Sequence, residues 1–447
     1  MPVIKKCRCS LWLFFWLVVG APMRCQETVL AFQLETNVRI PSTSWDNSRV
    51  LSPFALCMAK ATKKKKKKGG KAGGGRSGLK GFGVVVPSSA SSSSSIFEMD
   101  RSKQAREFYD YLEKGGAGDN LNRCGLGYFP LEGVEGAKLR GVAALKDIKK
   151  GDVIIRIPYE LAVNLGPEGG DPTLPGVTLL HDYCQTLAPS GDNTQNGKRP
   201  YFQMLPPFLG DDCSGSTDFF SDNALNAIKA PLIVDETLKR KQLTKMRFDS
   251  DVATDDAFPK WIENDEDVTA QHLQWAVWLI TSRILTVQGD ADEGQSYRLL
   301  IPFLDMCNHD RSSPHILTGR AVPGGELKVV AGATVKAGDQ INICYGGGMA
   351  GNDRFLQDYG FLDTSSNNMA FDMVAQQILG KRRILEGAGS GRLMSSIDQE
   401  KTLSELRSTT MEEDQAALES SSDLDMRFAI QYRMGVKKAL SKFGAME

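Results

Sequence analysis

The sequence contains little of what metal, disulfide and histidine chemistry requires. Only four of its 447 residues are histidines, and its nine cysteines form no Cys-x-x-Cys pair and no Cys/His cluster. We therefore expect free thiols in a reducing compartment, no metal site, and no catalytic Ser-His-Asp set. The apolar run at residues 11–19 is far shorter than the about twenty residues that cross a membrane, so we expect no stable membrane anchor.

The formal net charge is zero, but basic and acidic residues are distributed unevenly along the chain. Residues 1–97 carry 16 basic and 3 acidic residues, whereas the remainder carries 38 basic and 51 acidic residues. The overall composition, with 41% hydrophobic and 24% charged residues, is that of a soluble globular protein, which excludes a wholly disordered or collagen-like chain. A chain of this length predicts two or three domains, and we expect the fold to begin near Glu98.

The N-terminal part has the features of a targeting sequence. Basic residues precede the run at 11–19, which suits the apolar region of a signal peptide. Ala31 and Phe32 follow, and then an acid-poor stretch that contains Ser, Thr and Arg. This order resembles the bipartite presequence of proteins that enter secondary plastids. It implies a plastid location, with simple secretion as the alternative.

A lysine run at residues 63–68 and seven serines within 88–95 complete this part. Such a polycation could attract nucleic acid or act as a nuclear address. It carries no aromatic residues on which bases could stack, so we favour a solvated linker and expect no nucleic-acid partner. Residues 1–97 are therefore predicted to be a presequence and a disordered linker.

The body begins with a predicted amphipathic helix over residues 102–114 and continues with short strands. Gly-Asp turns precede strands predicted at 153–157 and 340–344, and another strand is expected at 139–143. Turns of this kind between short Ile-rich strands indicate a small antiparallel assembly and not a βαβ repeat.

Helical patterns lie between and after these β-regions. Helices are predicted over 225–248 and 271–286, and the chain from about Ser365 is expected to be helical throughout. The last helix has an apolar stripe, and its basic residues Arg433, Lys437 and Lys438 lie elsewhere on the helix. The stripe consists of Met426, Ala429, Ile430 and Met434.

Glycines at 346–351 match the G-x-G-x-x-G pattern of dinucleotide sites. That interpretation requires an early βαβ unit with an acidic residue at the end of its second strand, whereas here only helices follow. We therefore reject it.

Three runs together point to another family. They are Ile-Pro-Phe-Leu-Asp-Met-Cys-Asn-His at 301–309, Ile-Asn-Ile-Cys-Tyr-Gly at 341–346, and an Asn at 352 followed by Tyr-Gly-Phe at 359–361. This combination resembles the SET domain of protein methyltransferases. More narrowly, it is similar to the subgroup typified by the Rubisco large-subunit lysine methyltransferase and the actin-histidine methyltransferase.

Other segments carry the same resemblance, which extends from about residue 100 to the end. They lie at 139–158, 200–206, 275–285 and 429–440. Two departures stand out. Asp310 follows the Asn-His pair where the family usually has Ser, and the loop after Tyr345 is unusually rich in glycine.

The resemblance implies an α+β fold, with a β-rich SET core of the β-clip type. A helical insert splits this core, and an all-helical C-terminal substrate-binding domain follows it. We expect the SET domain at 98–364, its insert at about 160–270, and the helical domain at 365–447.

The chemistry implied is methyl transfer from S-adenosyl-L-methionine to a protein amine. A lysine must lose its proton before it attacks, and an apolar channel beside a positive sulfonium favours the neutral amine. A tyrosine hydroxyl can orient that amine without adding charge, and the resemblance assigns this catalytic role to Tyr345. It implies cofactor contacts from Asn308, His309, Asp305, Arg283, Tyr359 and Gly141. It implies substrate contacts from Ser282, Leu285 and Tyr359.

We interpret the sequence as a protein-lysine N-methyltransferase that acts on a plastid protein such as Rubisco or an aldolase. Two alternatives stay open: a histidine methyltransferase with the same fold, and a catalytically inactive SET fold that binds proteins.

Overall fold

The computed structural model of the chain describes residues 97–130, 138–188, 197–210, 215–262, 266–290, 294–364, 368–383 and 393–446. The predicted presequence and linker therefore lie outside the described residues, apart from Phe97. Among the helices of the described part, none is both long enough and apolar enough to span a bilayer.

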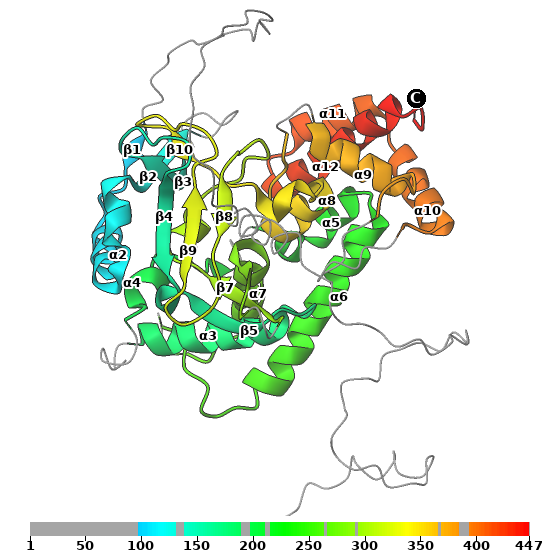
Figure 1. Cartoon of the computed structure of the whole chain (residues 1–447). Coiled ribbons are helices and arrows are strands. Elements are labelled where there is room, and N and C mark those ends of the chain that lie inside the picture. The colour runs from blue at the N-terminus through cyan, green and yellow to red at the C-terminus, as the bar shows by residue number, and fades with distance from the viewer. Residues whose placement is uncertain are drawn as a thin grey trace, which may run out of the picture. The chain divides into compact units, whose positions relative to one another are not determined.

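The strands of the described part form three small antiparallel sheets (Figure 1). Their orders are β1-β2-β3-β10, β4-β9-β8 and β5-β7-β6. The strands are β1 (Glu98–Met99), β2 (Cys124–Pro130), β3 (Lys138–Ala144), β4 (Val153–Pro158), β5 (Val163–Pro167), β6 (Leu285–Gln288), β7 (Ser296–Leu300), β8 (Ile316–Thr318), β9 (Glu326–Val330) and β10 (Gln340–Ile341). Small antiparallel sheets combined with many helices confirm the expected α+β class.

Both Gly-Asp turns have the same construction. Gly151 and Gly338 lie at φ 91° and 90°, a left-handed conformation that glycine adopts without steric cost. In each turn the Asp side chain, Asp152 or Asp339, accepts a hydrogen bond from the backbone N–H three residues earlier, at 3.2 and 2.9 Å. The turn chemistry read from the sequence is therefore confirmed.

Two predicted boundaries are wrong. The strand expected over 340–344 contains only β10, because Ile343 leaves the sheet and forms an isolated parallel bridge with His309. The helix expected to reach residue 286 ends at Arg283, and β6 follows it and pairs with β7. β-Branched residues at 284, 286 and 287 favour this strand.

The predicted helix over 225–248 is two helices. Lys229 adopts φ 57°, and Pro231 then occupies the first turn of α6, where its missing N–H costs nothing. The predicted insert also contains β5, which pairs with β7. The helices are α2 (Lys103–Leu112), α3 (Thr173–Leu187), α4 (Arg199–Phe202), α5 (Asp222–Ala227), α6 (Pro231–Arg247), α7 (Ala270–Arg283), α8 (Asn352–Arg354), α9 (Met369–Ile378), α10 (Ser396–Arg407), α11 (Met411–Ser420) and α12 (Leu424–Lys442).

The buried apolar side chains form two main clusters. The larger cluster joins the sheets to α2, α3 and α7, with Phe108, Ile155 and Trp275 at its centre. The second cluster joins α5 and the start of α6 to the C-terminal helices, which are orange to red in Figure 1. Leu225 and Ile233 pack there with residues of α9 and α12. The insert and the C-terminal helices therefore share one core.

The last helix buries two residues that the sequence places off its apolar stripe. Arg433 and Lys437 lie 2.7 and 2.6 Å from the carboxylate oxygens of Asp414, which is fully buried. Arg433 also donates to the carbonyl of Ala227 on α5, at 2.8 Å. This ion cluster ties α11, α12 and α5 together, and the partner carboxylate lies too far along the chain for helix periodicity to reveal it.

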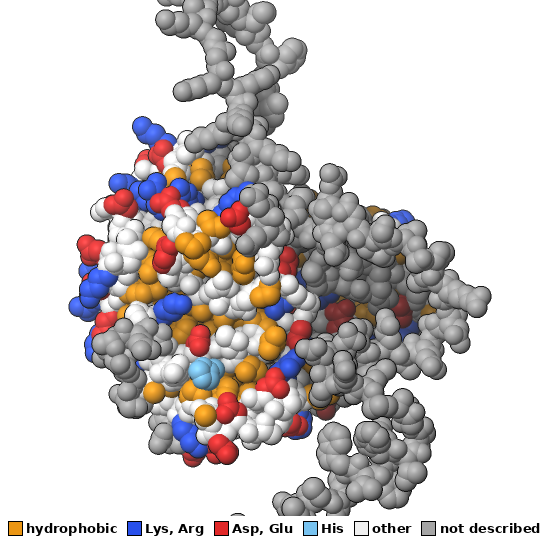
Figure 2. All heavy atoms as spheres, turned by 60° about the horizontal axis from the view of Figure 1, so that its bottom comes forward, with side chains coloured by type: hydrophobic (Ala, Val, Ile, Leu, Met, Phe, Trp, Pro, Cys, Tyr) orange, Lys and Arg blue, Asp and Glu red, His pale blue; other side chains and the backbone are white. Residues whose placement is uncertain are grey.

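The face of the described body shown in Figure 2 carries acidic and basic side chains interspersed, with apolar side chains between them. The acidic excess of the body therefore forms no single acidic patch on this face.

Candidate active site

The run that ends in Asn-His follows β7 through a strained turn. Phe303 adopts φ 70°, and its ring is fully buried. A non-glycine residue in this region costs about 1–3 kcal/mol, and such strain persists only where packing holds it. The short helix η7 (Leu304–Met306) follows and directs Asp305 inward.

The Asn-His run and the strand that leads to Tyr345 lie side by side. The N–H of Ile343 donates to the carbonyl of Asn308 (2.9 Å), and the N–H of Asp310 donates to the carbonyl of Ile343 (3.1 Å). The N–H of Tyr345 then donates to Nδ1 of His309 (3.0 Å). Two motifs that are 36 residues apart in the sequence thus form one structural unit.

A small cavity opens beside this unit. Six of the nine residues predicted for the site line it, and four apolar or thiol-bearing side chains complete the wall. The predicted residues are Ser282, Arg283, Leu285, Asp305, Tyr345 and Tyr359. The others are Ile284, Leu304, Cys307 and Ile343. The structure therefore brings together residues from α7, β6, η7 and the segment around Tyr359.

Tyr345 lies in the wall of this cavity with its hydroxyl held in place. The hydroxyl donates to the carbonyl of Cys307 at 2.7 Å, and the ring stacks on Tyr359 with 5.1 Å between centroids. Burial raises the pKa of Tyr345 above its ordinary value, so the phenol stays protonated at neutral pH. The hydroxyl uses its single proton in the bond to Cys307, and the lone pairs on its oxygen can accept a hydrogen bond from another group.

Asp305 lines the cavity and has two polar neighbours. Its Oδ2 accepts from the Tyr201 hydroxyl (2.9 Å) and lies 3.9 Å from Arg283, which also donates to the Asp305 carbonyl (3.1 Å). Burial raises the pKa of Asp305 to about 6, although Arg283 and Tyr201 both favour the ionised form. Oδ1 of Asp305 and Nε of Arg283 are buried without a hydrogen-bond partner in the described structure.

Two substrate contacts were expected from α7 and β6, namely Ser282 and Leu285. The Ser282 hydroxyl donates to the carbonyl of Trp278 on the same helix (2.7 Å). Leu285 is 5% exposed and offers the cavity an apolar surface.

Asn308, His309 and Gly141 lie beside the cavity and do not line it. The Asn308 amide donates to the carbonyl of Arg140 (3.0 Å). A Cβ at Gly141 would come within 2.7 Å of the Asn308 amide nitrogen and 2.5 Å of that of Gln340, so a side chain there would have to displace both amides. The Gln340 amide nitrogen is buried without a hydrogen-bond partner in the described structure.

Sequence reasoning missed several residues that build the site. Tyr201 lies in the segment 200–206 that carries the family resemblance, and the sequence assigns it no role, although its hydroxyl donates to Asp305. Phe355 and Phe361 stack on each other and both pack against the His309 ring, with centroids 4.7 and 5.8 Å from it. Phe361 stood inside the Tyr-Gly-Phe motif, and this was the signal that could have identified it.

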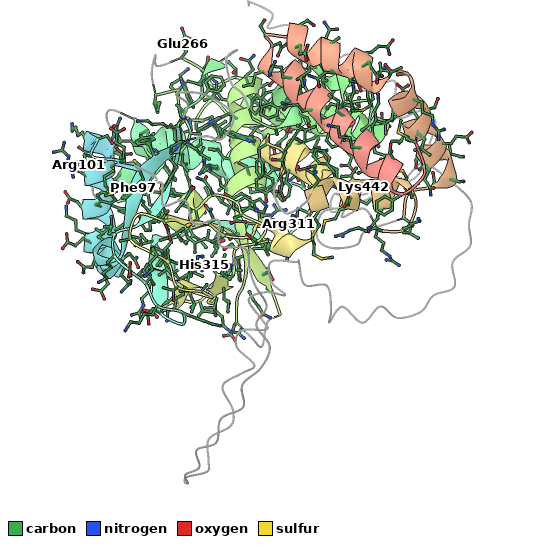
Figure 3. All side chains as sticks on the ribbon, turned by 90° about the horizontal axis from the view of Figure 1, so that it is seen from above. Phe97, Arg101, Glu266, Arg311, His315 and Lys442 are labelled. Carbon is green, nitrogen blue, oxygen red and sulfur yellow. The ribbon has the colours of Figure 1, made fainter. Side chains whose placement is uncertain are left out.

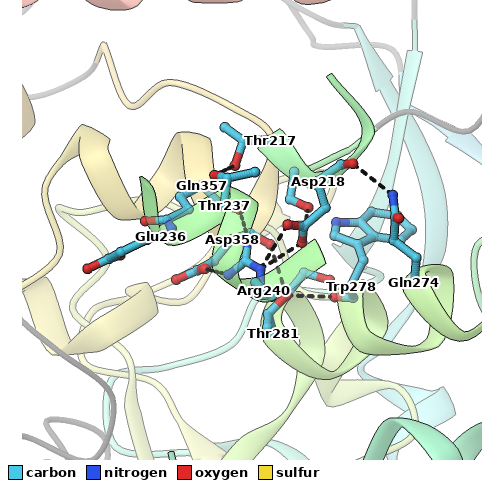
Figure 4. Close-up of polar contacts among 12 residues, drawn as sticks. Thr217, Asp218, Glu236, Thr237, Arg240, Gln274, Trp278, Thr281, Gln357 and Asp358 are labelled. Carbon is cyan, nitrogen blue, oxygen red and sulfur yellow. Dashed lines mark hydrogen bonds and ion pairs between the residues drawn. The ribbon is translucent and has the colours of Figure 1, made fainter. Parts of the chain in front are cut away.

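Arg240, from the predicted insert, fixes the segment that carries Tyr359 (Figure 4). Its guanidinium lies 2.8 Å from Asp218 and 2.7 Å from Asp358, and it donates to the carbonyl of Gln357 at 2.7 Å. Burial raises the pKa of Asp218 despite this cation. The two residues before Tyr359 are thus both bound to helix α6.

Comparison with known proteins agrees with the motifs. No protein-family model matches the chain. It is 21% identical over 259 residues to the chloroplastic ribulose-1,5-bisphosphate carboxylase/oxygenase large subunit N-methyltransferase of Pisum sativum. It is 24% identical over 251 residues to the chloroplastic fructose-bisphosphate aldolase-lysine N-methyltransferase of Arabidopsis thaliana. Each match covers 53% of this chain and 48% of the relative, so the chain spans about half the length of these relatives.

Among solved structures, the SET domain of LSMT bound to lysine and AdoHcy aligns with a TM-score of 0.48 at 16% identity, over 77% of this chain and 90% of that one. Rubisco LSMT bound to AdoMet aligns with a TM-score of 0.47 at 16% identity, over 76% and 90%. The two sequence matches confirm that the chain is similar to the chloroplastic Rubisco large-subunit and aldolase N-methyltransferases, the group that the motifs indicate.

Proposed function

We propose that this chain is an S-adenosylmethionine-dependent protein-lysine N-methyltransferase. The observation that carries the proposal is the Tyr345 hydroxyl, which stands neutral in the wall of a largely apolar cavity. The hydroxyl donates its proton to the carbonyl of Cys307. Among the described residues, no cation lies within hydrogen-bond distance of the hydroxyl oxygen, so a lone pair of this oxygen is available to an incoming amine. Within this proposal, residues 98–364 form the SET domain, with its insert at about 160–270, and residues 365–447 form the substrate-binding domain.

The cavity wall favours the reactive form of the substrate. Ile284, Leu285, Leu304 and Ile343 supply apolar surface, and burial there disfavours a charged ammonium. Tyr345 accepts a hydrogen bond from the neutral amine and thereby fixes the direction of its lone pair. Methyl transfer needs no covalent enzyme intermediate, so this positioning supplies most of the rate.

The polar residues around the cavity fit S-adenosylmethionine. When bound, this cofactor supplies a methyl group on a positively charged sulfonium. Arg283, with an unpartnered Nε, suits a carboxylate, and the unpartnered Oδ1 of Asp305 suits an ammonium or hydroxyl. The amides of Asn308 and Gln340 beside the bare Gly141 backbone suit polar edges of a nucleoside. These residues would hold the cofactor.

Both matched relatives are named as chloroplastic enzymes, and one is named as acting on lysine. These names favour lysine over histidine as the acceptor, and a plastid over the secretory pathway as the location. Rubisco and fructose-bisphosphate aldolase are therefore the candidate substrates, and the presequence read in residues 1–97 would direct the chain to them.

Substitution Tyr345→Phe tests the catalytic assignment. Loss of the hydroxyl removes the acceptor that orients the amine, so kcat should fall by roughly a hundredfold. Transfer of a tritiated methyl group from S-adenosylmethionine to purified Rubisco and aldolase measures this change. Tyr111→Phe is the matched control, because this half-buried hydroxyl also donates to a backbone carbonyl, that of Leu161 at 3.3 Å, but lies outside the cavity.

If Tyr345→Phe kept the wild-type rate, the role assigned to this residue would be wrong. Calorimetric titration of S-adenosylmethionine into the wild-type chain separates the enzyme from an inactive binding module. A folded chain that bound none would favour the module.

A further inference from the structure

Arg311, directly after the Asn-His-Asp run, is a buried cation that the site described above does not use. Its side chain is 5% exposed. Its guanidinium donates to the carboxylate of Asp363 (2.7 Å) and to the carbonyls of Gly348 (2.9 Å) and Ala350 (2.7 Å). Figure 3 labels Arg311 near the middle of the described body. All three acceptors are buried or half-buried, so these bonds determine where the acceptors lie.

The two carbonyls belong to the glycine-rich loop that follows Tyr345. Gly346, Gly347 and Gly348 adopt φ values of 59°, 59° and 76°. Three consecutive left-handed residues are accessible to glycine but leave the loop little intrinsic stiffness. Arg311 fixes the far side of this loop by two hydrogen bonds, and so limits the freedom of the backbone that leaves Tyr345.

The third acceptor connects Arg311 to His309. The Asp363 carboxylate that receives Arg311 lies 3.6 Å from Nε2 of His309. Asp363 is itself anchored, because the Asn352 side chain donates to its carbonyl (3.0 Å) and accepts from its N–H (2.7 Å). The carboxylate therefore has a fixed position behind the imidazole.

The tautomer of His309 follows from its contact with Tyr345. Nδ1 accepts the N–H of Tyr345, so in the neutral ring the proton is on Nε2, on the side of Asp363. The Asp363 carboxylate on that side of the ring favours this tautomer.

We propose that Arg311 is a positioning residue for Tyr345, acting through the glycine loop on one side and through Asp363 and His309 on the other. The inference rests on the proposed methyltransferase function. It also gives a role to the glycine-rich loop, one of the departures from the family pattern, because Arg311 donates to two of its carbonyls.

The test is Arg311→Met, which keeps most of the side-chain volume and removes the donors. A displacement of Tyr345 of about 1 Å should lower kcat by roughly ten- to a hundredfold. The dissociation constant for S-adenosylmethionine, measured by calorimetry, should stay close to that of the wild type. Arg123→Met is the control, because Arg123 also donates to a backbone carbonyl and a side chain, those of Ile154 and Asn120, but outside the site.

The double variant Arg311→Met/Asp363→Asn separates positioning from simple structural support. It removes the buried carboxylate that has lost its guanidinium, so the melting temperature should recover toward the wild-type value. The kcat should stay low, because the glycine-rich loop still lacks its two hydrogen bonds from Arg311. Recovery of kcat together with stability would overturn the inference, as would a folded Arg311→Met chain with wild-type kcat. A wild-type chain that neither binds S-adenosylmethionine nor transfers methyl groups would instead contradict the proposed function.

Discussion

The Arg240 contacts allow a prediction of stability with a definite sign and pH dependence. Arg240→Met removes the cation between Asp218, whose side chain is 2% exposed, and Asp358, whose side chain is 20% exposed. Breaking a buried ion pair from one side costs about 3–5 kcal/mol, because a charge is left buried without its partner. Asp358 is partly solvated and keeps Arg354 at 3.9 Å, so we expect a loss of about 3 kcal/mol at pH 7.

The destabilisation caused by Arg240→Met should become smaller as the pH falls. Burial raises the pKa of Asp218 even beside Arg240, and without the guanidinium it must rise further. The native variant then binds more protons than the unfolded chain at mildly acidic pH, and linkage makes its stability increase as the pH decreases. Urea unfolding of the full chain at pH 7 and at pH 5 measures both quantities.

Arg247→Met is the control on the same helix. Arg247 pairs with Asp171 and Asp251 at 3.1 and 2.9 Å, but its side chain is 28% exposed and those of its partners are 38% and 33% exposed. Pairs of this kind contribute about 0–1 kcal/mol, so this variant should lose little. The reasoning would be refuted if Arg240→Met lowered the free energy of unfolding by less than about 1 kcal/mol at pH 7. It would also be refuted if the decrease at pH 5 were as large as that at pH 7.

Two further predictions concern Asp305 and the presequence. The stability contributed by protonated Asp305 is full below its unfolded pKa near 3.9 and is lost as the pH rises through about 6. From pH 5 to pH 7, the free energy of unfolding of the wild type should therefore decrease by about 1 kcal/mol relative to that of Asp305→Asn, as measured by urea unfolding. A difference between the two proteins that did not change with pH would contradict the raised pKa. A fluorescent fusion of residues 1–97 should enter the plastid of an alga with a secondary plastid. Retention in the cytosol, entry into the nucleus or secretion would contradict the plastid location.

The parts of the fold that could be read from the sequence are those set by local chemistry. Gly151 and Gly338 mark turns because only glycine accepts their backbone angles easily, and the strands after them follow. Likewise, Tyr345 and His309 each lie in a short motif that identifies them. The parallel contact between these motifs could not be derived from either motif alone, because it depends on the path of the chain between them.

What the sequence missed depends on partners that are distant along the chain. The acidic partner of Lys437 is on another helix, so the helix pattern of α12 placed this lysine off the apolar stripe when it is in fact buried. Arg240 and Asp358 are 118 residues apart, and Arg240 lies in none of the recognised motifs. Periodicity reports which residues are apolar, whereas the pairing of buried charges is decided by tertiary packing.

The long-range bonds around Tyr345 have a consequence for the order of folding. Tyr201 reaches Asp305 across 104 residues, and Asn308 reaches Arg140 across 168. Contacts of such separation form late, because the entropy of closing large loops is lost before the contacts stabilise the chain. A growing chain that has not yet reached Asp363 has no complete support for His309. Competence to bind the cofactor should therefore appear only once the whole β-rich body has closed, and a partly made chain would neither bind nor consume it.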